Sequence, residues 1–106
     1  MPPSTPDTQP LEALEKANRT RSDHARVLRE LRGADPQEAR QRLSELLLSS
    51  PAEVRTMRVE RLVRGPRFIG KAKAGRALRR ADALPWHPVG QLTVRQRMAL
   101  AEEVGS

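Results

Sequence analysis

Cysteine and tyrosine are absent from the 106 residues of this chain, and only two aromatic residues, Phe68 and Trp86, are present. Without cysteine the chain can form no disulfide and no thiolate metal site, which fits a reducing cytosol. Its two histidines, His24 and His87, lie too far apart for a metal-ligand spacing and are expected on the surface. The hydrophobic fraction of 37% predicts a small core, and Trp86 is expected to cover one edge of it.

Long apolar runs are also missing. No run approaches the ~18–20 residues of a membrane span. The first residues, Met1 to Pro6, contain neither a basic nor an apolar segment, so we expect no signal peptide. No nucleophile–base pair and no metal-ligand cluster is recognisable. We therefore expect a cytoplasmic protein that is not an enzyme and that uses no cofactor, metal ion, membrane or small-molecule substrate.

Positive charge is abundant and concentrated. The chain has 20 basic and 13 acidic residues, a net charge of +7. Ten of the basic residues fall between Arg55 and Arg80, opposed there only by Glu60, so this arginine-rich segment carries +9 and the remainder −2. Such a patch predicts a polyanionic partner, with nucleic acid favoured over an anionic membrane surface. A solvated charged face is the alternative interpretation.

The spacing of apolar residues, prolines and glycines predicts an all-α fold with about five helices. Residues 1–10 hold four of the nine prolines and are expected to form a disordered tail. Residues 11–33, which end at a glycine, should form a long, largely exposed helix. Residues 34–106 should form a small helical globule.

Caps and breaks predict the helix ends within the globule. Asp35-Pro36 is an N-cap and first-turn signal, and Gly65-Pro66 is a break. A helix is expected from about Gly70 to Ala81, with a buried face of small residues.

A last helix should begin after Thr93, because Thr93 and Gln96 have the spacing of a capping box. Its inward-facing residues are expected to be Val94, Met98 and Ala101, with Leu100 a further candidate.

The segment from Gly65 to Lys71 is the best candidate for a binding site. One helix ends there, the chain turns, and a new helix begins at Gly70. A helix N-terminus exposes unpaired N–H groups and partial positive charge, and a glycine lets a phosphate approach closely. Arg67, Lys71 and Lys73 would add full charges. Contacts of this kind bind the nucleic-acid backbone without reading the bases.

Several short motifs, spread over most of the chain, resemble one protein family. They are Met57-Arg58-Val59, Leu62-Val63, Arg67-Phe68-Ile69-Gly70-Lys71, Val89-Gly90-Gln91-Leu92 and, near the start, Ala13-Leu14-Glu15-Lys16-Ala17. In this order and spacing they are similar to the single-chain integration host factor family of actinobacteria, over most of the chain. The family has Pro-Gly where this chain has Arg67-Phe68, and arginines where it has His87-Pro88, so the chain resembles a divergent member or paralogue.

The resemblance implies a helix-two-turn-helix core that binds duplex DNA in the nucleoid with little sequence preference and bends or compacts it. By resemblance, Gly70, Lys71 and Lys73 match a first phosphate-gripping turn, and Gly90, Leu92 and Thr93 match a second. Residues 34–106 would then be the DNA-binding domain. Phe68 either packs against the protein or inserts at a base step.

Charge and resemblance together give the expected DNA-contacting residues. They are Arg64, Arg67, Gly70, Lys71, Lys73, Arg76, Arg80, Gly90, Thr93 and Arg95. The expected function is that of a nucleoid-associated protein. Binding of structured RNA or the ribosome is the alternative, because A-form and B-form helices share the same phosphate chemistry. A third hypothesis gives the long first helix a role in binding another protein.

Overall fold

The computed structural model describes the backbone of residues 4–105 and the side chains of residues 11–105. The described chain is helical, which confirms the all-α prediction, and no strand occurs in these residues beyond an isolated bridge between Arg58 and Pro88. Its elements are α1 (Ser4–Gly33), α2 (Pro36–Ser49), α3 (Val59–Val63), α4 (Lys71–Arg80), the short 3-10 helix η1 (Val89–Gln91) and α5 (Val94–Gly105).

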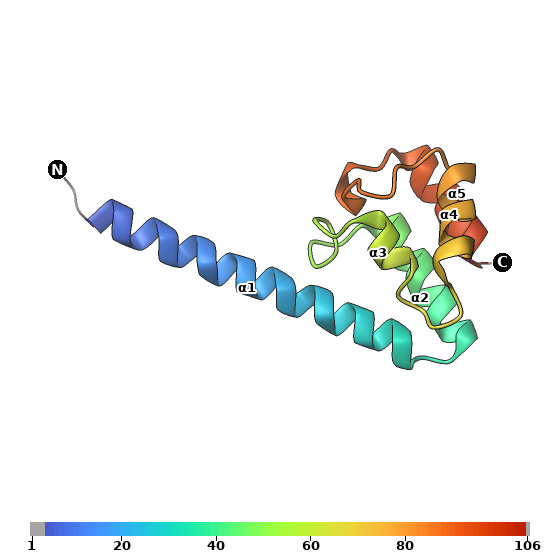
Figure 1. Cartoon of the computed structure of the whole chain (residues 1–106), viewed down its shortest axis with the longest axis horizontal. Coiled ribbons are helices and arrows are strands. Elements are labelled where there is room, and N and C mark those ends of the chain that lie inside the picture. Colours follow the sequence, from blue (N-terminus) through green and yellow to red (C-terminus); the bar gives the residue numbers. More distant parts are fainter. Residues whose placement is uncertain (1–3, 106) are drawn as a thin grey trace.

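The helix α1 projects from the globule that the other helices form, as Figure 1 shows. Only its C-terminal part is packed: Val27 and Leu31 are buried, whereas Leu11 and Leu14 are exposed. The helix begins at Ser4, so residues 4–10 of the expected disordered tail are helical instead. A first-turn proline is compatible with this, because the N–H it lacks would have no partner within the helix. Residues 1–3 lie outside the described residues.

The pair α2 and α5 forms the centre of the globule. The backbone N–H of Glu38 donates to Asp35 Oδ1 at 2.9 Å, so α2 begins at the predicted cap. It ends at Ser50, which adopts the left-handed conformation (φ 45°, ψ 58°) and donates its N–H to the Leu46 carbonyl. The Ser44 hydroxyl donates to the Ala101 carbonyl at 3.1 Å and joins the two helices.

The inward face of α5 agrees with the prediction only in part. Ala101 is buried as predicted, together with the candidate Leu100 and with Val104, whereas Val94 and Met98 are 70% and 59% exposed. The start of α5 is joined to the end of α4, because Gln96 Nε2 donates to the Asp82 carbonyl at 2.9 Å.

The segment before α5 runs beside the segment before α3. The N–H groups of Val59, Val89 and Gly90 donate to the carbonyls of His87, Met57 and Arg55 at 2.8, 2.9 and 2.9 Å. Trp86 lies in this segment and is 60% exposed, so the prediction that it covers the core is wrong. Smaller side chains from the same segment line the core in its place, namely Ala83, Val89 and Leu92.

Candidate nucleic-acid interface

The N-terminus of α4 is open. Gly70 is its N-cap in an extended conformation (φ −87°, ψ −176°), no described side chain caps this end, and the first turn holds no acid. Around Gly70 itself, no described atom lies within 4 Å of the position that a Cβ would take. Lys71 and Lys73 belong to this first turn. The first N–H groups and two ammonium groups are therefore available to an anion, as the sequence predicts.

A surface hollow of about 360 Å³ lies in front of this helix end. Its lining includes Arg32, Arg64, Arg67 and Gly70. Arg64 is held near Glu60, with Nη1 3.9 Å from Oε1, in a pair that is half exposed on both sides. Within the described part of the chain, Arg32 and Arg67 have no carboxylate at ion-pair distance. Three guanidinium groups thus line one hollow beside an uncapped helix N-terminus.

Two arginines of α1 extend this surface, and the sequence reading missed both. Arg32 lines two further hollows, one shared with Arg29 and Arg67 and one shared with Arg61 and Arg64. We call Arg29, Arg32, Arg61, Arg64 and Arg67 the arginine cluster. Arg29 and Arg32 lie outside the arginine-rich segment. Their position in the last turns of α1 was the signal in the sequence that could have indicated a binding role. Basic residues at that position are also explained by the helix dipole, which favours positive charge at a helix C-terminus.

Phe68 packs against the protein. It is half-buried beside the core, with the Arg40 guanidinium carbon 4.9 Å and the Lys73 ammonium 5.2 Å from its ring centroid. Both distances are within the range of cation–π attraction. Phe68 therefore contacts Lys73 in the first turn of α4, and its ring is not presented for insertion between bases.

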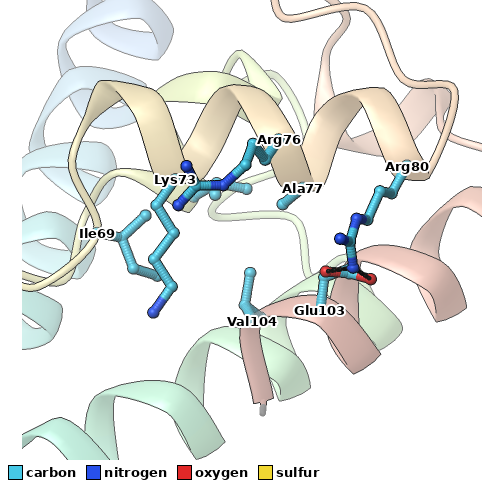
Figure 2. A pocket seen from close by; sticks show the side chains of 8 residues that line it. Ile69, Lys73, Arg76, Ala77, Arg80, Glu103 and Val104 are labelled. Atoms are coloured by element: carbon cyan, nitrogen blue, oxygen red, sulfur yellow. Dashed lines mark hydrogen bonds and ion pairs between the residues drawn. The ribbon is translucent and has the colours of Figure 1, made fainter.

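The basic face of α4 continues beyond its first turn. Lys73, Arg76 and Arg80 line a pocket of about 280 Å³ between α4 and the end of α5 (Figure 2). Glu103 lies across the pocket, and Arg80 Nη1 approaches its Oε1 to 3.2 Å. Arg80 is thus partly neutralised, whereas Lys73 and Arg76 form no ion pair within the described residues.

The expected second turn uses its polar groups internally. The N–H of Gly90 donates to the Arg55 carbonyl, and its own carbonyl accepts from Arg97 Nη2 at 3.2 Å. The N–H of Gln96 donates to Thr93 Oγ1 at 3.1 Å, and Gln96 Oε1 accepts from the N–H of Thr93 at 2.9 Å. This is the predicted capping box. The same bonds engage the Gly90 N–H within the protein and use Thr93 Oγ1 as an acceptor.

The two expected turns also lie at opposite ends of α4. Gly70 is the N-cap of this helix, whereas the start of α5 is bonded to Asp82 just past its C-terminus. Ten helical residues span about 15 Å. The structure therefore groups Arg64, Arg67, Gly70 and Lys71, continues with Lys73, Arg76 and Arg80 along α4, and leaves Gly90, Thr93 and Arg95 apart.

The two histidines differ in burial, since His24 is packed inside the protein and His87 is half-buried. His24 is 8% exposed, so the expectation of a surface position is wrong, and its Nε2 lies 3.4 Å from Thr56 Oγ1. Burial lowers its pKa, the Arg61 charge adds to this, and Asp23 opposes it. The described side chains, those of residues 11–105, include no cluster of three or more metal-ligating groups, and no described helix is long and apolar enough to cross a membrane.

Comparison of the chain with protein-family models, with curated proteins and with solved structures gives no match. The relation to the actinobacterial integration host factor family therefore stays a hypothesis that rests on the sequence motifs.

Proposed function

We propose that the protein binds duplex DNA through its backbone phosphates with little sequence preference, as a nucleoid-associated protein, and that it bends or compacts the duplex. The observation that carries the proposal is the uncapped N-terminus of α4, which opens onto a hollow lined by Arg32, Arg64 and Arg67. Helix N-termini and arginines are the usual phosphate ligands of DNA-binding proteins.

The charge distribution supports binding to an extended polyanion over binding to a single small anion. The arginine cluster and the basic face of α4 adjoin the same helix end but come from α1, α3, the segment between α3 and α4, and α4 itself. Neutralising phosphates on both sides of this end would favour bending of the duplex toward the protein. The proposed function is binding alone and includes no catalysed reaction.

A titration at several salt concentrations tests the proposal. If ~6 phosphates are neutralised, the logarithm of the affinity should fall with the logarithm of salt concentration at a slope of about −5. Arg32→Ala and Lys71→Ala should each reduce that slope by about 1 and weaken binding to all sequences alike. Arg42→Ala is the matched control, because Arg42 already lies 3.8 Å from Glu45 and 4.0 Å from Glu53.

Two outcomes would count against the proposal. An affinity that does not depend on salt would exclude phosphate binding, and a loss confined to one sequence would indicate base readout. Structured RNA is the alternative partner, since the same groups can hold an A-form backbone. Competition between duplex DNA and duplex RNA at one salt concentration separates the two.

A further inference from the structure

Trp86 is presented at the tip of a closed turn. The N–H of His87 donates to the Leu84 carbonyl at 3.1 Å, so Pro85 and Trp86 occupy the two central positions of a four-residue turn. Proline at the first central position fixes the backbone angle there. The indole is 60% exposed, although a large aromatic side chain normally gains by burial.

The protein holds this turn on both sides of Trp86. The Pro85 carbonyl accepts from the N–H of Glu60 at 3.1 Å, and the His87 carbonyl accepts from the N–H of Val59 at 2.8 Å. These two donors are consecutive residues at the start of α3. The backbone under Trp86 is therefore fixed by hydrogen bonds, while the side chain is left out of the core.

The surroundings of the turn are basic. Arg58, the N-cap of α3, is bridged to Pro88, and Arg61 lies one turn further along the same helix. Both arginines are exposed, and neither has an ion-pair partner in the described residues. The nearby acid, Glu60, is held by Arg64. The exposed indole thus lies on a turn whose next residues are bridged to Arg58, an arginine without an ion-pair partner among the described residues, and a basic surface is more complementary to a nucleic acid than to an apolar protein surface.

We infer that Trp86 inserts at a base step of the bound duplex and kinks it, an inference that rests on the proposed function. Apolar side chains of DNA-bending proteins act as wedges in this way. A projecting single ring suits a wedge. A stacking platform for single strands needs several exposed rings, and Phe68, the only other aromatic of the chain, is packed between protein groups.

The chain carries its own probe for the test. Trp86 is the only tryptophan and there is no tyrosine, so the indole emission of the full-length protein reports on this one residue. Saturation with duplex DNA should quench the emission. A duplex with a dye at each end should show a bend in the range of about 20–90° in the native complex. Trp86→Ala should lose that bend, and Trp86→Phe should retain most of it.

Affinity should change less than bending does. Trp86→Ala is expected to weaken binding about fivefold, the low end for a base–aromatic contact, because the cost of unstacking the step is lost as well. Leu48→Ala is the matched control, since Leu48 is an exposed apolar residue (51%) on α2, and it should leave both quantities unchanged. Circular dichroism checks that each variant is folded.

The result that overturns the inference is distinguishable from failure of the proposed function. If binding depends on salt but the indole emission does not change, the insertion of Trp86 is excluded and the proposed phosphate binding still stands. The wedge would also be excluded if the emission is quenched but the duplex stays bent in the Trp86→Ala complex. The indole would then lie against the DNA without kinking the duplex. A native protein that does not bind duplex DNA would refute both.

Discussion

Gly70 and Gly90 were expected to play the same part, and substitution by alanine separates them. At Gly70, a Cβ would meet no described atom within 4 Å. At Gly90, it would collide with Cγ of Arg55 and lie 3.1 Å from the Arg55 carbonyl oxygen. Neither glycine has a positive φ, so the difference between the two sites comes from packing alone.

The magnitudes follow from these surroundings. Gly90→Ala overpacks the contact with Arg55, which costs roughly 1–3 kcal/mol, and regains ~0.4–1 kcal/mol because alanine restricts the unfolded chain. A net loss of about 1 kcal/mol lowers Tm by about 4–8 °C in a domain of this size. Gly70→Ala loses about half of a cap preference of ~0.5–2 kcal/mol and regains a similar amount because alanine restricts the unfolded chain, so its Tm should stay nearly constant.

DNA affinity should show the opposite order. Gly70→Ala places a methyl group where a phosphate would approach the backbone, so binding should weaken although the fold is intact. Gly90→Ala should leave affinity unchanged below its Tm, because the Gly90 N–H already bonds Arg55. Thermal melts followed by circular dichroism, together with titrations of both variants in one buffer, measure the two quantities. A Gly90→Ala variant with native Tm and lost affinity would refute this reasoning.

Three further predictions concern single side chains. Because burial lowers the pKa of His24 below its ordinary value of 6.5, the folded state favours the neutral ring. Stability should therefore be full above pH 6.5 and decline as the pH falls below it, and denaturant melts of His24→Gln should lose this dependence. Thr93→Ala removes a helix cap, so it should lower the stability of the fold by about 0.5–2 kcal/mol and lower Tm, while DNA affinity stays unchanged. Reduced affinity in a folded variant would show that Thr93 contacts DNA. Glu103→Gln, which frees Arg80, should raise affinity at low salt more than Glu102→Gln does, and equal effects would exclude a role for this ion pair.

Local chemistry made most helix ends predictable. Asp35-Pro36, Gly70 and the pair Thr93–Gln96 each act through bonds within a few residues, so their role can be inferred without a tertiary structure. The open end of α4 is one of these local features. The first element of the candidate site was therefore accessible from the sequence.

Features that depend on distant segments were not predictable. Trp86 and Val94 are apolar and were expected inside, but both side chains are exposed, and the turn that carries Trp86 is held through its backbone by residues at the start of α3. Arg32 joins the site only because the end of α1 packs beside Arg64 and Arg67. His24 is buried where α1 meets a distant segment, since its Nε2 lies 3.4 Å from Oγ1 of Thr56.

The arrangement around α3 fixes how phosphate grip and wedge would act together in the proposed complex. The turn that carries Trp86 is bonded to the first residues of α3, whereas Arg64, which follows its last residue, lines the hollow at Gly70. The two proposed contacts are therefore joined to opposite ends of the same short helix, α3, and are made by different side chains. Trp86→Ala should reduce bending more than affinity, because the phosphate contacts around Gly70 remain.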